Sequence, residues 1–248
     1  NTALKLAKGE YIAFLDHDDE LTEDALYHVA LTINNNPNAE LIYSDEDKID
    51  LKGNLKHPFF KPDWSPDLIH VYNFVCHLSV YKKTTLDLIG GLNSAFDGAQ
   101  DWDLVMRYVD KIDSNSIYHI PRILYHWRLT DNSTALDINN KKYSIEAAEL
   151  AINEDILRKN NKANLKYNFQ LQAFIETPIL EEEPLVSIII PTRNSLKLIK
   201  TVTNDILNKT NYSNFEIIIL DNDSNEMETM NWFNDIKSNK KVRVITCP

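Results

Sequence analysis

Three things are scarce in this 248-residue chain: cysteine, basic charge and long apolar runs. Its two cysteines, Cys76 and Cys247, are too few for a disulfide scaffold. No apolar run approaches the roughly 20 residues that a membrane-spanning helix needs. With 26 basic and 37 acidic side chains the net charge is −11, whereas binding to nucleic-acid phosphates needs a dense basic patch. We therefore expect a globular protein of one large or two small domains, with no nucleic-acid partner.

The start of the chain predicts where it works. No secretory leader precedes Asn1, and no initiator methionine is present. Residues 1–8 have the pattern of the second half of a helix that ends at Gly9. We expect the chain to begin inside a larger gene product and to work in the reducing cytoplasm, with contact at the inner face of the cell membrane left open.

Residues 1–159 have an order of elements that is typical of α/β domains. The apolar run Glu10–Leu15 predicts a buried parallel strand, and it stops at the acidic segment Asp16–Asp19. A helix is predicted next, and a second short strand at residues 39–43 also runs into acidic residues, at 45–47.

A connection is predicted at residues 160–184, where Glu and Pro are frequent. Residues 185–248 then repeat the α/β order. Their three apolar strands are Val186–Ile190, Phe215–Leu220 and Val242–Thr246. This is a βαβαβ unit, half of a doubly wound sheet, which usually handles a nucleotide at the carboxyl ends of its strands.

The strongest candidate site is the segment Asp16–Asp19. Carboxylates at the end of a buried strand can hold a hard divalent cation such as Mg²⁺ or Mn²⁺. Alternatively, these aspartates only cap the helix that follows them. A phosphatase-type nucleophile is disfavoured, because Glu20 stands where that chemistry needs Thr or Val.

Three further residues have both a functional and a structural interpretation. Asp101 lies at the mouth of a predicted helix, where it can act as a general base or simply complement the helix dipole. His126 can be a ligand, although a lone histidine is more often hydrogen-bonded within the structure. Asp221 follows its strand and can accept from a base or a ribose hydroxyl, or form a turn.

Together these segments resemble the family 2 glycosyltransferases, which have the GT-A fold. The resemblance is carried by four segments: Ala7–Asp19 (AKGEYIAFLDHDD), Gly98–Leu104 (GAQDWDL), Val186–Asn194 (VSIIIPTRN) and Glu216–Ser224 (EIIILDNDS). Gln100 departs from the Glu that is usual in the second segment. Tyr43–Asp50, Phe60–Asp67 and Ile123–Arg128 are further similar to the bacterial members with tandem modules that build surface polysaccharide.

The resemblance implies an α/β, doubly wound and mostly parallel GT-A sheet and a set of roles. Asp101 would take the proton from the acceptor hydroxyl. A divalent cation, Mn²⁺ or Mg²⁺, would be held by Asp18, Asp19 and His126. Nucleotide contacts would come from Asp16, Thr192, Asn194 and Asp221. The implied reaction moves a sugar, with inversion, from a nucleotide-sugar donor to a glycan or lipid-linked glycan acceptor.

The order of the motifs differs from that of one family module, because the nucleotide-binding strands follow the Asp16–Asp19 segment. We expect residues 1–159 to be the later part of one module and residues 185–248 the beginning of another. The sheet would be completed by docking of 186–244 beside Tyr11–Leu15, in circularly permuted order or by domain swapping in a homodimer. The alternatives are a non-catalytic nucleotide- or carbohydrate-binding fragment and a nucleotidyltransferase or phosphatase with a similar sheet.

Overall fold

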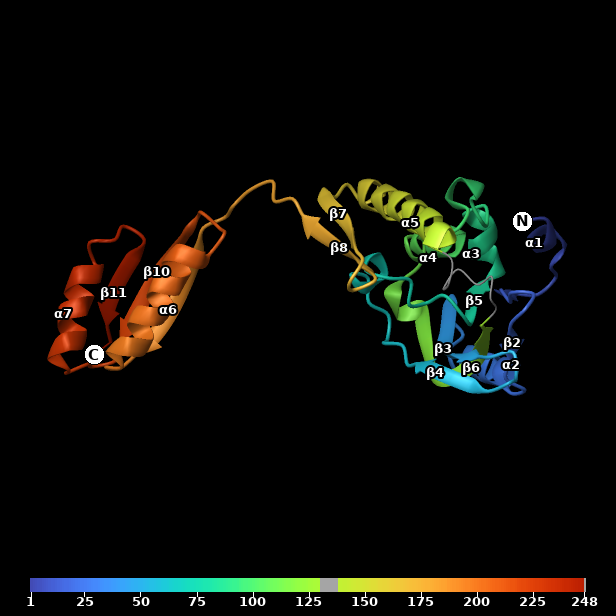
Figure 1. Ribbon diagram of the computed structural model, residues 1–248, viewed down its shortest axis with the longest axis horizontal. Helices are drawn as coiled ribbons and strands as arrows, with labels where there is room; N and C mark the ends of the chain where they lie inside the picture. The colour runs from blue at the N-terminus through green and yellow to red at the C-terminus, as the bar shows by residue number, and fades with distance from the viewer. Residues whose placement is uncertain (130–137, 248) are drawn as a thin grey trace. The chain divides into compact units, whose positions relative to one another are not determined.

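The computed structural model describes residues 1–129 and 138–247, and it divides into two compact units, Asn1–Ile179 and Leu180–Pro248 (Figure 1). We call them unit 1 and unit 2. Each has its own sheet and its own hydrophobic core. No helix in the described residues is long and apolar enough to cross a membrane.

Unit 1 is built around a six-stranded mixed sheet with the order β1-β5-β3-β6-β2, in which β4 pairs with β3. Its strands are β1 (Tyr11–Ala13), β2 (Glu20–Leu21), β3 (Leu41–Ile49), β4 (Leu55–Phe59), β5 (Ser79–Lys82) and β6 (Ile117–Arg128). Its helices are α1 (Thr2–Leu6), α2 (Ala25–Asn35), α3 (Lys83–Leu88), α4 (Gln100–Val109) and α5 (Ile138–Arg158). Short 3₁₀ turns stand at Leu68–His70, Ser94–Phe96 and Ser114–Ser116.

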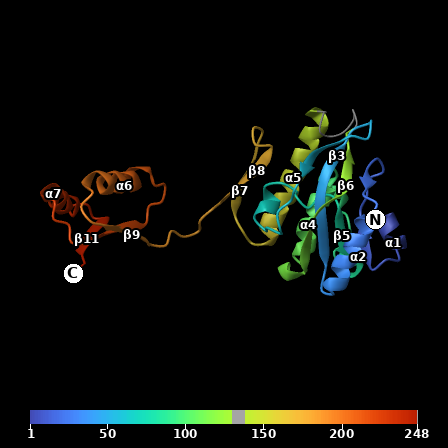
Figure 2. The same ribbon diagram turned by 90° about the horizontal axis from the view of Figure 1, so that it is seen from below.

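The sheet of unit 1 is covered on both faces (Figure 2). Leu41 and Tyr43 of β3 pack into the cluster that includes α4 and α5, whereas Ile42 between them packs with α2 on the other face. This alternation follows from the two-residue period of side chains along a strand. The central position of β3 explains why both of its faces are apolar at residues 41–43.

The strand before the acidic segment differs from the prediction. We expected a buried parallel strand over Glu10–Leu15, but β1 has three residues, stands at the end of the strand order and pairs antiparallel with β5. Leu15 is half exposed. Within unit 1, parallel pairing is found only between β3 and β6 among the described residues.

Part of the expected connection at 160–184 is regular structure. Strands β7 (Ala163–Asn168) and β8 (Ala173–Pro178) form an antiparallel hairpin that belongs to unit 1. The backbone N–H of Phe174 donates to Val71 O at 2.9 Å, and Phe174 is buried in the unit 1 core. The polar and proline-rich composition of the segment concealed the alternating burial of the hairpin.

Unit 2 has the predicted βαβαβ order. Its elements are β9 (Val186–Thr192), α6 (Leu196–Lys209), β10 (Phe215–Asp221), α7 (Met227–Ile236) and β11 (Val242–Thr246). The sheet is parallel with β10 in the centre, and one face packs against both helices. Ile189 on β9 is 64% exposed, so β9 is half buried here rather than fully buried as its sequence suggested.

Candidate active site

The acidic segment after β1 forms a group with a histidine that the sequence analysis did not select. One carboxylate oxygen each of Asp16 and Asp19 and a ring nitrogen of His77 all lie within 4.8 Å of one another. The Asp16 side chain is 66% exposed, and its Oδ2 lies 3.7 Å from His77 Nε2. The group is therefore open to a ligand from solvent.

Strand β6 holds the acidic loop in place. The Tyr125 hydroxyl donates to Asp19 Oδ2 at 2.5 Å, and the Arg128 backbone N–H donates to Asp19 Oδ1 at 2.8 Å. Arg128 Nε also donates to the carbonyl of Asp18 at 2.6 Å. Burial raises the pKa of Asp19, because the loss of hydration outweighs the hydrogen bonds that favour its charged form.

His77 is fixed by aromatic and charged neighbours. Its ring stacks on Tyr125 with the centroids 4.6 Å apart and meets the edge of Trp127 at 5.7 Å. Its Nδ1 lies 3.8 Å from Glu46 Oε2. The imidazole is thus held flat against β6 with its Nε2 side toward Asp16.

Asp101 lies in the first turn of α4 and is half-buried. Asn73 Nδ2 donates to Asp101 Oδ2 at 2.8 Å, and Cys76 Sγ lies 3.5 Å from the same oxygen. Burial, reinforced by the Asp101 charge, holds the pKa of the Cys76 thiol well above its usual value, so Cys76 is a neutral donor. These contacts orient the carboxylate of Asp101.

One short segment joins Asp101 to the acidic loop. Asn73 and Cys76 contact Asp101, and the next residue, His77, faces Asp16 and Asp19. The buried Lys61 ammonium anchors this segment by donating to the carbonyls of Val75 and His77, and it pairs with Glu46 at 3.0 Å. The candidate base and the candidate metal ligands are therefore positioned by the same stretch of chain.

Two of the predicted metal ligands have other contacts. His126 Nδ1 lies 2.5 Å from Asp47 Oδ1 within the sheet. Asp18 Oδ1 lies 3.7 Å from the exposed His17 ring. The structure groups Asp19 with Asp16 and His77 rather than with Asp18 and His126.

The predicted nucleotide residues of unit 2 lie at the carboxyl ends of β9 and β10, the edge where parallel sheets bind nucleotides. Asn194 Oδ1 accepts from the backbone N–H groups of Asn225 and Glu226, and the backbone N–H of Asn194 donates to Ser224 Oγ at 2.7 Å. The buried Asp221 Oδ1 accepts from the Ser224 N–H at 3.0 Å, which is the turn-forming role that its position also suggested. Asn194 therefore binds the two strand-end loops together, whereas the Asp221 side chain closes the turn of its own loop.

These loops have strained backbones. Asn194, Ser195 and Asp223 have positive φ angles of 56°, 59° and 56°, a region that non-glycine residues seldom adopt. Such residues cluster at sites where the chain is shaped for a ligand.

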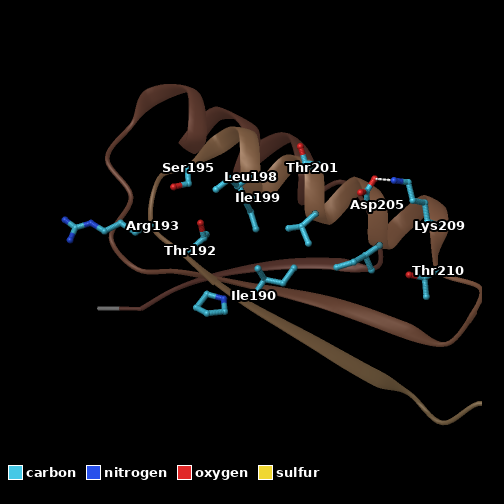
Figure 3. Close-up of a pocket in the computed structure, with 13 residues that line it drawn as sticks. Ile190, Thr192, Arg193, Ser195, Leu198, Ile199, Thr201, Asp205, Lys209 and Thr210 are labelled. Atoms are coloured by element: carbon cyan, nitrogen blue, oxygen red, sulfur yellow. Dashed lines mark ion pairs between the residues drawn. The ribbon is translucent and has the colours of Figure 1, made fainter. Parts of the chain in front are cut away.

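Thr192 lines a pocket of about 760 Å³ between the end of β9 and α6 (Figure 3). The walls are mostly apolar, with Ile190 from the strand and Leu198 and Ile199 from the helix, and an ion pair of 2.8 Å joins Asp205 to Lys209 near the far end of α6. The cationic side chains among the lining residues are Arg193 and Lys209, and Thr192, Arg193 and Ser195 form the polar end of the pocket.

Sequence reasoning missed His77, Asn73 and Cys76. All three lie in the stretch Tyr72–Tyr81, whose apolar residues are typical of a strand. The available signal was the presence of polar residues inside an otherwise apolar segment. Asn73 and Cys76 approach Asp101 across 28 and 25 positions of sequence, which no local pattern encodes.

Comparison with known proteins decides the family. A model of glycosyl transferase family 2 matches residues 1–89 and 187–248. The chain belongs to glycosyl transferase family 2. The predicted α/β class is confirmed, and the architecture of the two units is consistent with the GT-A fold of this family.

The relatives include two with names that describe polysaccharide synthesis. The chain is 34% identical over 229 residues to the O-antigen biosynthesis protein RfbC of Myxococcus xanthus (92% of this chain, 18% of the relative). It is 26% identical over 172 residues to the chondroitin synthase of Escherichia coli (68% and 24%).

A further relative, the uncharacterized protein y4gI of Sinorhizobium fredii, is 40% identical over 250 residues (99% of this chain, 27% of the relative). The chain thus spans about a quarter or less of the curated relatives that it matches. A crystal structure of S. aureus TarS 1-349 in complex with UDP is similar with a TM-score of 0.43 and 16% identity, over 63% of this chain and 44% of that one.

Proposed function

We propose that this chain carries the catalytic side of an inverting glycosyltransferase that moves a sugar from a nucleotide-sugar donor to a hydroxyl of a cell-surface glycan. The observation that carries the proposal is the common segment Asn73–His77, which orients Asp101 at one end and faces the Asp16 and Asp19 carboxylates at the other. The base for the acceptor and the acidic group for the donor lie on different elements, and both border this one segment.

In this proposal Asp101 accepts the proton of the acceptor hydroxyl. The hydroxyl oxygen forms a bond to the anomeric carbon as the bond from that carbon to the diphosphate oxygen breaks on the opposite face, so the configuration inverts. Asn73 keeps the carboxylate of Asp101 oriented through its hydrogen bond. The half-buried position of Asp101 limits competition from water.

Two carboxylates and an imidazole suit a divalent cation, with Mn²⁺ favoured over Mg²⁺ by the nitrogen donor. Asp16, Asp19 and His77 would hold it, in place of the set Asp18, Asp19 and His126 that the sequence suggested. When bound, the cation supplies positive charge beside the departing diphosphate.

Unit 2 would hold the nucleoside through Thr192, Asn194 and Asp221. This assignment remains a proposal, supported by the position of the three residues at strand ends and by the strained loops around them. The strands β1 and β9 each stand at the end of their own strand order.

The acceptor class is inferred from the relatives, two of which are named for O-antigen biosynthesis and chondroitin synthesis. We propose a growing polysaccharide or its lipid-linked form. A lipid-linked acceptor would bring the protein to the inner face of the cell membrane.

Replacement of the proposed base tests the function. Asp101→Asn should lower sugar transfer from a panel of nucleotide sugars, in the presence of Mn²⁺, by roughly 10²- to 10⁴-fold, because general-base catalysis is lost while the shape is kept. Glu154→Gln, an exposed acid of unit 1, is the matched control and should keep activity.

Three outcomes are informative. Nucleotide binding without turnover in wild type and Asp101→Asn alike would favour a non-catalytic binding fragment. Release of phosphate or pyrophosphate in place of free or transferred sugar would favour a phosphatase or nucleotidyltransferase. Equal transfer activity in Asp101→Asn and wild type would remove Asp101 from the mechanism.

A further inference from the structure

The hairpin β7–β8 lies outside both segments that match the family model, yet it borders Asp101. The matched segments end at residue 89 and resume at 187, whereas the hairpin spans residues 163–178. Two of its side chains, Tyr167 and Phe174, and Gln172 at its turn line the same pocket as Asp101. Asp101 lies in the same stretch outside the family model, so the hairpin and the candidate base border one pocket where an acceptor hydroxyl must arrive.

The pocket has the size and lining of a saccharide site. Its volume is about 560 Å³. Its aromatic and acidic lining residues are Tyr72, Asp101, Trp102, Trp127, Tyr167 and Phe174. Ligand pockets of this size combine apolar walls with a few polar groups. The apolar C–H face of a sugar ring stacks on aromatic rings, and its hydroxyls need a small number of polar partners.

The walls are held rigidly. Trp102 Nε1 donates to Ile69 O at 2.6 Å, and the Trp102 ring meets the edge of Phe174 at 5.7 Å. Phe174 in turn meets the Tyr167 ring at 5.0 Å. This series of contacts runs from α4, which bears Asp101, to the hairpin. The Tyr167 ring is consequently fixed relative to the base.

A contact through His70 fastens the hairpin to the rest of unit 1, and Asp155 of α5 holds the same ring from its other nitrogen. His70 Nδ1 lies 2.5 Å from Glu176 Oε2 of β8, and His70 Nε2 lies 2.7 Å from Asp155 Oδ2 of α5. The turn is closed by Asn168 Oδ1, which accepts from the N–H groups of Gln170 and Leu171. Gln172 has a φ of 52°, and this left-handed conformation sets its exposed side chain at the rim of the pocket.

From this geometry we propose that the β7–β8 hairpin is the acceptor-selecting element of the enzyme. One pyranose ring of the acceptor saccharide stacks against Tyr167, Gln172 hydrogen-bonds a ring hydroxyl at the rim, and the hydroxyl to be glycosylated faces Asp101. The inference rests on the proposed transfer function, whose acceptor site it locates.

The test measures saccharide binding without any donor. The probes are the methyl glycosides of glucose, galactose, N-acetylglucosamine and glucuronic acid, titrated into the whole chain and followed by saturation-transfer NMR. At least one glycoside should bind, with the ring C–H protons most saturated. Tyr167→Leu, which keeps an apolar side chain against Phe174 but removes the ring, should weaken that affinity about three- to tenfold.

The matched control lies on the same hairpin. Phe169 is 77% exposed, its ring lies 5.1 Å from that of Tyr167, and it does not line the pocket, so Phe169→Ala should leave the glycoside affinity unchanged. Gln172→Ala changes an exposed residue without affecting packing, and should weaken the same glycoside by about twofold or more through the lost hydrogen bond. The Gln172→Ala variant keeps the proposal testable if Tyr167→Leu does not fold.

Two results would overturn the proposal: absence of binding for every glycoside, or equal effects of Tyr167→Leu, Gln172→Ala and Phe169→Ala. Hydrolysis of nucleotide sugars measured on the same samples separates this inference from the proposed function. Donor hydrolysis with no glycoside binding rejects the hairpin site alone. Glycoside binding that depends on Tyr167, with no donor hydrolysis or transfer, supports the site and rejects the transferase.

Discussion

Two acidic segments of unit 1 follow apolar strand residues, and the structure uses them in opposite ways. Asp45, Glu46 and Asp47 lie inside β3 and are 2%, 7% and 5% exposed. The segment Asp16–Asp19 lies beyond the end of β1 in a loop, where the Asp16 side chain is 66% exposed. The local sequences are alike, but only the second segment is open to a ligand.

The difference is made by basic side chains that are distant in sequence. Asp45 lies 2.8 Å from His119, Glu46 lies 3.0 Å from Lys61, and Asp47 lies 2.5 Å from His126. A buried carboxylate needs such a partner, because removal of its hydration is otherwise too costly. In the loop, the Asp16 side chain stays largely hydrated, and Asp19 accepts from the Tyr125 hydroxyl and the Arg128 backbone N–H. An acidic segment inside a strand is thus structural here, whereas one beyond a strand end is available for chemistry.

The largest effect is expected from breaking the buried pair of β3. Lys61→Met should lower the free energy of unfolding by about 3–5 kcal/mol, because Glu46 is left buried without its cation. Chemical denaturation measures the change. Lys83→Met, which removes an ion pair with the half-exposed Asp87, is the control and should cost about 1 kcal/mol or less. Equal losses in the two variants would show that burial of the β3 acids does not matter.

Smaller changes in stability are expected from two isosteric variants, Asp47→Asn in β3 and Asp16→Asn in the loop, which we compare for both stability and Mn²⁺ affinity. Asp47→Asn should lower the free energy of unfolding by about 1–3 kcal/mol, because a buried charged hydrogen bond to His126 is weakened. Asp16→Asn should change stability by no more than about 0.5 kcal/mol. Mn²⁺ affinity should move in the reverse sense, falling roughly tenfold or more in Asp16→Asn only. If Asp47→Asn were the variant that lost Mn²⁺, the division between the segments would be wrong.

Much of this contrast between the two acidic segments cannot be predicted from the sequence. The three strands of unit 2 match the predicted segments closely, and its two helices follow the predicted βαβαβ order, because residue period and strand-end residues are local signals. The roles of His77 and His126 could not be separated in that way. His126 contacts Asp47 across 79 positions of sequence, and His77 reaches Asp16 from another strand connection. These partners come together only through the order of the strands in the folded sheet.

The hairpin was missed for the same reason. Its composition predicts a connection, and the contacts that order it come from His70, 106 positions before Glu176. Strand β1 was predicted parallel because its apolar run resembles a buried central strand, but its neighbour β5 is antiparallel and its other edge has no partner strand in the described part of the chain.

The smallest effect on stability is expected from His70, the buried histidine that fastens the hairpin. The pKa of His70 is raised above its ordinary value of 6.5. Burial acts to lower it, but the hydrogen bonds and charges of Asp155 and Glu176 outweigh burial. Because the folded state favours the protonated ring, the stabilisation is complete below about pH 6.5 and is lost as the pH rises through the raised pKa.

Measurements of the free energy of unfolding between pH 6 and 9 test the predicted direction of this pH dependence. Wild type should lose stability over this range relative to His70→Gln, which cannot take up the proton. If the free energy of unfolding changed with pH equally in wild type and His70→Gln, the pH dependence would not come from His70. Glycoside affinity should fall over the same range only if loss of the ion pairs also loosens the hairpin.

The central claim is that the strand-end acids and His77, beside Asp101, form one donor site. Crystals of the chain grown with Mn²⁺ and a nucleoside diphosphate, measured at the manganese absorption edge, test it most directly. We predict an anomalous difference peak within about 2.0–2.6 Å of Asp16, Asp19 and His77. A peak on Asp18 and His126, or on the acids of β3, would contradict the account.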